Sequence, residues 1–520
     1  MLPHKSRLLS SALAVVFVLF ALSCSSGPSD LRSMMPGDAL VYLESNDLYR
    51  AVGAMVENKQ FLNAAASIPD LSVLKGIQLA VAVTGFEVRE EQLNEQSSVG
   101  KVQPKFVAVA DTHAWSWQAR KFAENQLGEF INKAYGGGVN LETADNAEGT
   151  KYVWTAEDGR KAFAMVSGSL VFFANDEGSL DRALATRRGD GDPISKNSNV
   201  PPPTGETLAT GYVSPEGVQQ LSNVFGMSVA LGAGEDQEVK SFVARVLPEI
   251  LRNSVKEISW VSTFGDGKYS DKYSISLAPD VSKIFSETIA VSKDTDTEIS
   301  KFVSPDLVSA TRYNLANPQI AWRSVLLTTQ NKTDQLSGKL IATFSSSLFE
   351  PYAIEDPETF LASVGSVLQT VRMDADGDDV VAIARVKDLE GVKRSIAKEI
   401  DLKKPAEKVG TADVWRSGDG EYAAAFSDGY VLLGDAESVI KCLRGGGSVN
   451  FGSSTISTVG HESDPTASLV EVVGERKNEN TPLIENYSVE TRFTQNGMER
   501  VTRSDFGLIG ELIGQMSEEK

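Results

Sequence analysis

Few residues in this 520-residue chain could do acid–base chemistry. Histidine is the usual general base near neutral pH, and beyond His4 the chain contains only His113 and His461, in different halves. His113 follows Asp111 and Thr112 just before a predicted helix, where helix capping explains these polar residues. No G-x-S-x-G sequence is present that could begin a Ser-His-Asp triad. The sequence therefore predicts no catalytic residue and favours a protein that is not an enzyme.

Acidic runs are the next candidates, because calcium binds clustered carboxylates. In the run 374–379, Gly377 stands two positions too early for a calcium loop, and Arg385 stands where the closing glutamate belongs. A tight turn between two strands explains this run better, and the run 294–298 is typical of a solvated linker or helix cap. Two cysteines and three histidines are too few for a zinc site. We expect no metal and no cofactor.

The N-terminus is typical of a secretory signal, with a basic start and an apolar run over 8–22. The sequence A-L-S-C, ending at Cys24, resembles the lipobox of bacterial lipoproteins, although Ala21 replaces the usual leucine. That resemblance implies cleavage after residues 1–23 and lipid attachment on the Cys24 sulfur. Residues 24–34 would then form a lipidated tether, with the bacterial cell envelope as location and a membrane as partner. An ordinary signal peptide with an incidental cysteine is the alternative.

The charge of the chain excludes some partners. There are 70 acidic and 50 basic residues, which gives a formal net charge of −20. Such a surface repels nucleic acid and anionic headgroups, so no nucleic acid is expected and membrane association would depend on the lipid. A protein partner in the envelope is compatible with this composition.

A stretch of the chain occurs twice, at 153–184 and at 414–443. Both copies begin Val-Trp and then share an Asp-Gly pair, two alanines and a further glycine at matching positions. Each copy predicts a strand, an Asp-Gly turn, a second strand, a glycine turn, a third strand and a helix capped by Asp176 or Asp435. Cys442 lies on the second of these helices, where we expect it to be buried and to act as a small apolar side chain.

Other landmarks repeat as well, since FVAVA at 106–110 matches VVAIA at 380–384. We therefore expect two diverged copies, at 35–290 and 305–520, joined by a linker at 291–304. Hairpins outnumber helical crossovers, which favours the α+β class, with mainly antiparallel sheets and helices packed on one side.

Tryptophans are the remaining candidates for a ligand surface. Trp154 and Trp415 occupy equivalent positions in the repeated stretch, which favours a packing role. A ligand-binding surface is nevertheless predicted from four of the six tryptophans: Trp115, Trp117, Trp154 and Trp415.

The segment Met35 to Val52, M-P-G-D-A-L-V-Y-L-E-S-N-D-L-Y-R-A-V, resembles the start of the bacterial domain of unknown function 3352. Members of that family are secreted or lipid-anchored, and no activity is established for them. The resemblance supports an envelope location and the fold, and adds no catalytic residue.

The leading hypothesis is a lipid-anchored envelope protein that binds or scaffolds a partner without catalysis. One alternative is an envelope hydrolase whose dispersed carboxylates converge only in three dimensions, and another is a periplasmic carrier of an apolar ligand. A deep pocket with inward carboxylates would favour the hydrolase. A large dry cavity between sheet and helices would favour the carrier.

Overall fold

The computed structural model describes residues 29–67, 70–94, 97–232, 237–294, 296–447, 449–463, 469–470, 476–477 and 483–515. The predicted signal peptide and Cys24 lie outside these ranges. Within them, no helix has both the length and the apolar character needed to cross a membrane.

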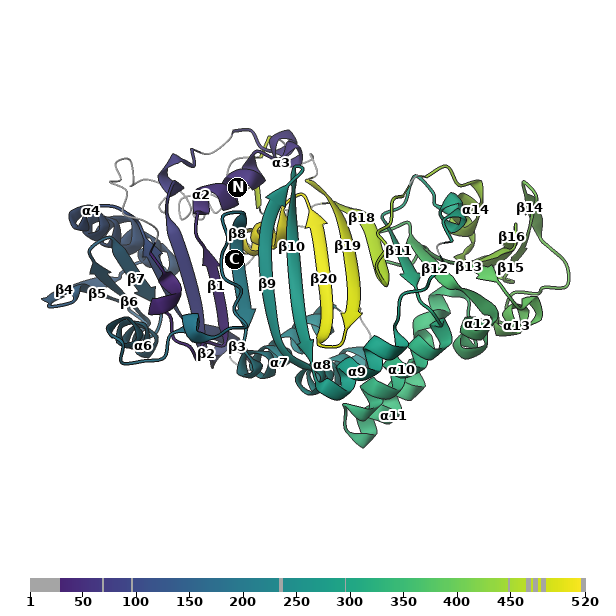
Figure 1. Cartoon of the computed structure of the whole chain (residues 1–520), viewed down its shortest axis with the longest axis horizontal. Helices are drawn as coiled ribbons and strands as arrows, with labels where there is room; N and C mark the ends of the chain where they lie inside the picture. The colour runs from purple at the N-terminus through teal and green to yellow at the C-terminus, as the bar shows by residue number, and fades with distance from the viewer. Residues whose placement is uncertain are drawn as a thin grey trace.

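The strands form one continuous antiparallel sheet of 20 strands, which runs the length of the molecule (Figure 1). Its centre is the pair β10–β20. On one side, from the centre outward, lie β10 (Lys268–Leu277), β9 (Val255–Gly265), β8 (Thr207–Val213), β1 (Val41–Ser45), β2 (Gln78–Asn94), β3 (Ser97–Asp111), β7 (Leu170–Ala174), β6 (Lys161–Ser167), β5 (Gly149–Thr155) and β4 (Asn140–Asn146).

On the other side lie β20 (Gly497–Ser504), β19 (Ile484–Thr494), β18 (Ile456–Ser463), β11 (Ser309–Asn314), β12 (Val364–Arg372), β13 (Val380–Val386), β17 (Tyr430–Asp435), β16 (Tyr422–Ser427), β15 (Ala412–Arg416) and β14 (Glu407–Val409). Each strand on this side is numbered ten higher than the strand at the same distance on the other side. The predicted α+β class and antiparallel pairing are confirmed, but the sheet is one body.

The longer helices are α2 (Leu48–Val56), α3 (Lys59–Ala64), α4 (Ser116–Lys121), α5 (Gly128–Ala134), α6 (Glu177–Arg188), α7 (Pro215–Gly232), α8 (Gln237–Ser254), α9 (Pro279–Thr288), α10 (Pro318–Asn331), α11 (Gln335–Phe344), α12 (Pro357–Ser363), α13 (Leu389–Ser395), α14 (Ala436–Arg444) and α16 (Gly507–Gln515). A π-helical segment, η3 (Phe122–Leu127), joins α4 to α5. Short 3-10 turns are η1 (Leu31–Met34), η2 (Ser72–Leu74), η4 (Ile194–Lys196), η5 (Glu298–Phe302) and η6 (Ser347–Tyr352).

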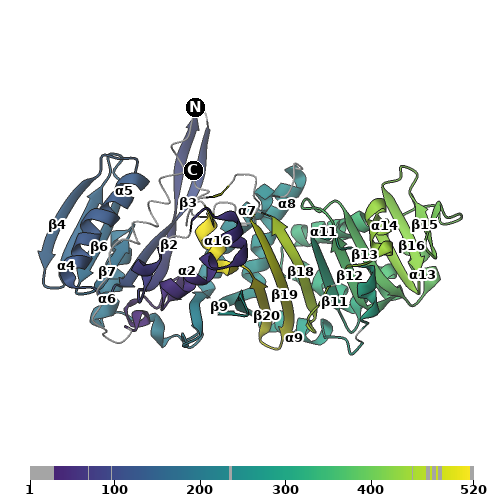
Figure 2. The same ribbon diagram turned by 90° about the horizontal axis from the view of Figure 1, so that it is seen from above.

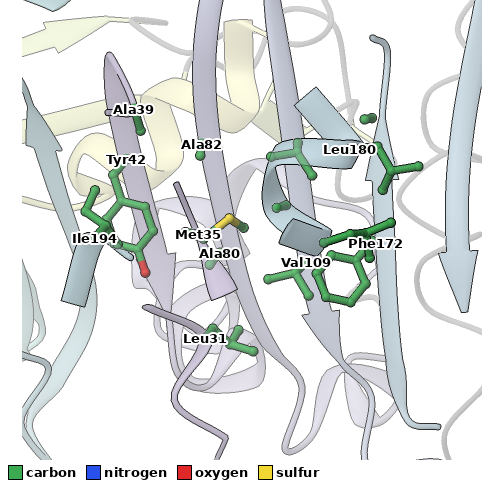
Figure 3. Close-up of a cluster of buried hydrophobic side chains, with 14 of the residues drawn as sticks. Leu31, Met35, Ala39, Tyr42, Ala80, Ala82, Val109, Phe172, Leu180 and Ile194 are labelled. Atoms are coloured by element: carbon green, nitrogen blue, oxygen red, sulfur yellow. The ribbon is translucent and has the colours of Figure 1, made fainter. Parts of the chain in front are cut away.

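Helices cover both faces of the sheet, so the prediction of helices on one side is wrong. Successive residues of a strand point to opposite faces. On β7, Phe172 packs with Leu180 of α6 (Figure 3), whereas Phe173 packs against the core beneath α4 and α5. Because both faces of the outer strands are apolar, each face needs its own helical cover.

The two ends of the chain are interlocked at the centre of the sheet. Helix α9, which follows β10, packs against β19 and β20, and α16, which follows β20, packs against β10 and α2. From above, the β2–β3 hairpin projects away from the sheet (Figure 2). The pairing of β2 with β3 continues along this hairpin as far as Asn94 and Ser97.

The local predictions for the repeated stretch are confirmed. Glycines 159 and 420 take left-handed φ values of 83° and 84°, which the Asp-Gly turns require. Asp176 accepts a hydrogen bond from the backbone of Ser179, and Asp435 accepts one from Ser438, so each aspartate caps its helix. The acidic run after β12 is likewise a turn, in which the Asp374 carboxylate accepts three backbone N–H groups.

The segment predicted as a solvated linker is packed instead. Asp296 is buried, and its carboxylate accepts hydrogen bonds from the Arg385 guanidinium and the Tyr430 hydroxyl. Phe302 at the end of η5 is buried in the core beneath α14. Residues 296–302 are therefore part of the fold and hold the start of the second half against β13 and β17.

Candidate functional site

An apolar cavity of about 370 Å³ lies between the sheet and the helices of the second half of the chain. This volume falls within the roughly 300–1,000 Å³ typical of small-molecule pockets. Its lining combines β11, β12, β13, β18 and β19 with α10, η6 and α12: Ile289, Tyr313, Leu315, Pro318, Ala321, Trp322, Val325, Leu348, Phe349, Tyr352, Ile354, Phe360, Leu361, Leu368, Gln369, Thr370, Ala382, Ile383, Ile456 and Phe493.

Strand register forms the floor of the cavity. Tyr313 on β11 pairs with Leu368 on β12, and Thr370 on β12 pairs with Ala382 on β13. Paired residues of neighbouring strands project to the same face. The small side chain of Ala382 therefore leaves room above the floor, while Tyr313 and Leu368 make it apolar.

The roof is fixed by the start of α10 and by η6. Asn317 caps α10 by accepting a hydrogen bond from the Ile320 backbone N–H, and Pro318 occupies the first turn, where a proline is tolerated. One turn further on, Trp322 meets Phe349 of η6 edge to face, with ring centroids 5.1 Å apart. This aromatic contact holds η6 over the cavity.

The polar side chains in the lining are Tyr313, Tyr352, Gln369 and Thr370. Burial raises the pKa of Tyr313 and of Tyr352, and the nearby Thr370 side chain partly offsets that effect for both. These phenols stay neutral over the physiological range. Together with Thr370 they can donate or accept hydrogen bonds to one small polar group on an otherwise apolar ligand.

The cavity opens to solvent beside η6. Leu348 is 66% exposed and Val325 is 36% exposed, although both line the cavity. These two side chains extend the apolar lining of the cavity to its rim. A hydrophobic molecule could enter here without crossing a polar barrier.

Among the lining residues that the structure describes, none is an aspartate, glutamate, histidine, lysine, arginine or cysteine. Tyr313, Tyr352 and Thr370 carry hydroxyls, and a hydroxyl acts as a nucleophile when a neighbouring base activates it. The chemistry available here is burial of apolar surface and hydrogen bonding to neutral hydroxyls.

A second hollow of about 520 Å³ lies over the centre of the sheet and contains carboxylates. Asp271 is buried there, but its two oxygens accept hydrogen bonds from the Trp260 indole N–H and the Leu508 backbone N–H, each at 3.0 Å. Burial raises the pKa of Asp271, and those donors oppose the shift. The Asp271 carboxylate therefore holds the start of α16 in place. Glu511, at the rim of the same hollow, is exposed.

The structure does not bring the four predicted tryptophans to one surface. Trp154 is 2% exposed and stacks on Tyr152 within the core beneath α4 and α5. Trp415 on β15 packs against Phe426 at the opposite end of the sheet from α4 (Figure 1). Trp115 and Trp117 stand at the start of α4, and each is 59% exposed.

Sequence reasoning missed the residues that line the cavity. The signal present in the sequence was the apolar spacing of Ala321, Trp322 and Val325, which lie on α10. Such spacing by itself indicates an ordinary helix face that packs on a core. Cys442 is buried as expected, and burial raises the pKa of its thiol to about 12. His113 lies beside Asp111, and the exposed His461 is on β18. Neither histidine lines the cavity.

Two solved structures resemble part of this fold, namely crystal forms IV and I of TP0453. They share 11% and 10% sequence identity with this chain, cover 52% of it and 90% and 91% of their own lengths, and have a TM-score of 0.24 in both cases. Likeness at this level carries no argument about function. No family model and no curated protein matches the chain. The resemblance of 35–52 to the domain of unknown function 3352 therefore stays a prediction.

Proposed function

We propose that this chain is a lipid-anchored, non-enzymatic protein of the bacterial cell envelope that binds an apolar ligand, such as a lipid acyl chain. The single observation that carries the proposal is the cavity of about 370 Å³ between sheet and helices, with its apolar lining and open apolar rim. Of the three hypotheses drawn from the sequence, the carrier is the one that such a cavity favours.

Binding without catalysis is supported by the chemistry of the lining. Apolar ligands gain roughly 25 cal/mol for each Å² of surface removed from water, and the aromatic side chains of Trp322, Phe349 and Phe360 supply that contact. The hydroxyls of Tyr313 and Tyr352 would orient one polar group of the ligand, such as an ester or carboxyl.

We also propose that the chain is a duplicated module. Strands β1 to β10 and β11 to β20 follow the same order outward from the β10–β20 pair. Helix α2 would then be the counterpart of α10. Among the described residues, the space next to α2 is filled by Met55, Phe61 and Phe506 in a buried core, whereas the space next to α10 holds the cavity.

Ligand binding is tested by titrating the full chain with a fluorescent C16 fatty acid. Ala321 is buried on α10 and lines the cavity, so Ala321→Leu fills space that the ligand would need. The same change at the exposed Ala342 on α11 is the matched control. We expect Kd to rise at least tenfold for Ala321→Leu and to stay within twofold of the wild type for Ala342→Leu.

A second variant guards against misfolding of the first. Leu348→Asp places a charge at the exposed rim, where folding tolerates it, and should also weaken binding. Equal affinity of the wild type and both cavity variants would overturn the proposal, and so would no binding by the wild type.

Anchoring at Cys24 is tested separately. A fatty-acid analogue supplied to growing cells should label the wild type and spare Cys24→Ala. Equal labelling of the two proteins would contradict the anchor.

A further inference from the structure

The first described residue of the mature chain is fixed to the body of the protein. The Ser29 hydroxyl donates a hydrogen bond to the Asp111 carboxylate. The Ser29 backbone N–H donates to the Gln78 side-chain oxygen at 2.9 Å, and the Gln78 amide donates back to the Ser29 carbonyl at 3.1 Å. Asp111 and Gln78 are 1% and 2% exposed. The tether therefore starts from a defined point at the end of β3.

The distance from this point to the predicted lipid is short. Cys24 precedes Ser29 by five residues, and a fully extended chain spans at most about 3.6 Å per residue, or roughly 18 Å in all. If Cys24 carries a lipid whose chains lie in a bilayer, the bilayer surface must lie within that reach of Ser29. Residues near Asp111 are then the part of the protein that faces the membrane.

Trp115 and Trp117 stand beside this point. Trp115 follows Asp111 by four residues, so the two lie within roughly 14 Å of each other. Two hydrogen bonds from backbone N–H groups hold the intervening loop. The Thr112 N–H donates to the Ser169 carbonyl, and the His113 N–H donates to the Asp111 carboxylate at 3.0 Å. The start of α4 therefore has a set position relative to the tether.

The exposure of these two rings has no explanation within the fold. Each is 59% exposed, whereas tryptophan is usually among the more buried residues. Tryptophan is enriched where one part of a protein meets a membrane–water interface, because its ring is apolar and its N–H can hydrogen-bond at the headgroup level.

The charge around the two rings also suits a bilayer surface. Helix α4, S-W-Q-A-R-K, carries Arg120 and Lys121 and no acidic residue, in a chain whose net charge is −20. The Lys121 ammonium lies 5.6 Å from the centre of the Trp117 ring. Basic side chains are attracted to an anionic leaflet, so the charge of α4 favours its approach to lipid headgroups.

We propose that Trp115 and Trp117 insert into the interface of the membrane that holds the Cys24 lipid and so fix the orientation of the protein on that membrane. The occupant of this surface is a lipid bilayer. The inference rests on the proposed anchoring at Cys24 and adds a second, non-covalent contact. With two points of contact, the sheet keeps one end near the bilayer instead of turning freely about a flexible tether.

The test uses the full, lipid-modified chain in vesicles of phosphatidylethanolamine and phosphatidylglycerol whose acyl chains carry bromine, which quenches nearby tryptophan fluorescence. The wild type is compared with Trp115→Phe/Trp117→Phe and with Trp415→Phe, a control at the other end of the sheet. We expect bromolipid quenching of the wild type and of Trp415→Phe. In the double variant, we expect the quenched signal to fall at least threefold.

Fatty-acid labelling of the same preparations separates the two claims. Labelled protein whose quenching is unchanged in the double variant overturns the tryptophan contact and leaves the anchor intact. Unlabelled wild-type protein overturns the anchor and the contact with it. Thermal unfolding of each variant checks that the exposed substitutions leave the fold unchanged.

Discussion

The Arg385 side chain on β13 donates a hydrogen bond from Nε to Asp296 Oδ2 at 2.7 Å. The second oxygen of the same carboxylate accepts from the Tyr430 hydroxyl at 2.6 Å. Asp296 belongs to the segment that precedes β11, whereas Arg385 and Tyr430 belong to paired strands further out in the sheet. This contact therefore closes a long loop and fixes how the second half begins.

Replacing Asp296 by asparagine should destabilise the protein at neutral pH. Burial alone would raise the pKa of Asp296, but hydrogen bonds from Arg385 and Tyr430 hold it below its ordinary value of 3.8. A lowered pKa means that the contribution is complete above pH 3.8 and is lost as the pH falls through the lower folded-state pKa. We expect Asp296→Asn to lose about 1.5–3 kcal/mol of unfolding free energy at pH 7.

Denaturant unfolding at pH 7 and at pH 3 measures this difference. The control is Asp428→Asn, since Asp428 forms an exposed ion pair with Lys301 at 2.9 Å, and exposed pairs contribute about 0–1 kcal/mol. Equal losses at the two sites, or a difference that grows as the pH falls, would contradict the buried role of Asp296.

Glu485 on β19 should make the protein less stable as the pH rises. Burial is the main cause that raises the pKa of Glu485 to about 7, with repulsion from Glu511 and Asp505 adding to it. The folded state then keeps a proton that the unfolded chain releases near its ordinary pKa of 4.5, so stability falls between pH 4.5 and 7. Glu485→Gln, which can still accept from the Phe506 N–H, should remove this fall.

We expect the stability of Glu485→Gln relative to the wild type to increase by about 3 kcal/mol from pH 4 to pH 8, since each pKa unit corresponds to about 1.4 kcal/mol. Glu462→Gln is the matched control, because Glu462 is the exposed partner of Glu485 on the neighbouring strand. Parallel stability–pH curves for the wild type and Glu485→Gln would refute the prediction.

The central strand pair should be sensitive to a single methyl group. Gly497 at the start of β20 has φ = 146°, and a Cβ atom there would lie 2.0 Å from the Ile275 carbonyl oxygen of β10. Gly497→Ala should cost about 1–3 kcal/mol through backbone strain, and more if the pairing shifts. Gly265→Ala on β9 has open space around the new methyl group and should change the melting temperature little. Similar melting temperatures for both variants would argue against a close approach at the centre.

The Cys442 thiol should be inert in the folded protein. Cys442 lies on the buried face of α14, and burial raises the pKa of its thiol to about 12. Because the thiolate is the reactive form, we expect no alkylation by iodoacetamide at pH 8 in a Cys24→Ala variant, and complete alkylation in guanidinium chloride. Stoichiometric reaction of the native protein would show that α14 opens readily.

The sequence determined those features that depend on neighbouring residues. The Asp-Gly turns, the helix caps at Asp176 and Asp435 and the buried position of Cys442 all follow from local rules about φ values, orphan N–H groups and apolar spacing. The α+β class and the antiparallel pairing followed in the same way, because hairpins are short-range structures.

Tertiary structure alone decided how the strands join and where space remains. The pairing of Tyr273 on β10 with Arg500 on β20 links residues more than two hundred positions apart, and no local pattern encodes such a partner. The cavity beside Trp322 depends on the angle at which α10 and η6 pass over the sheet, and the buried state of Asp296 depends on strands that lie far along the chain. The spacing of apolar residues indicates that one face of an element is buried. Only the packing of distant elements determines whether that face meets a filled core or an open cavity.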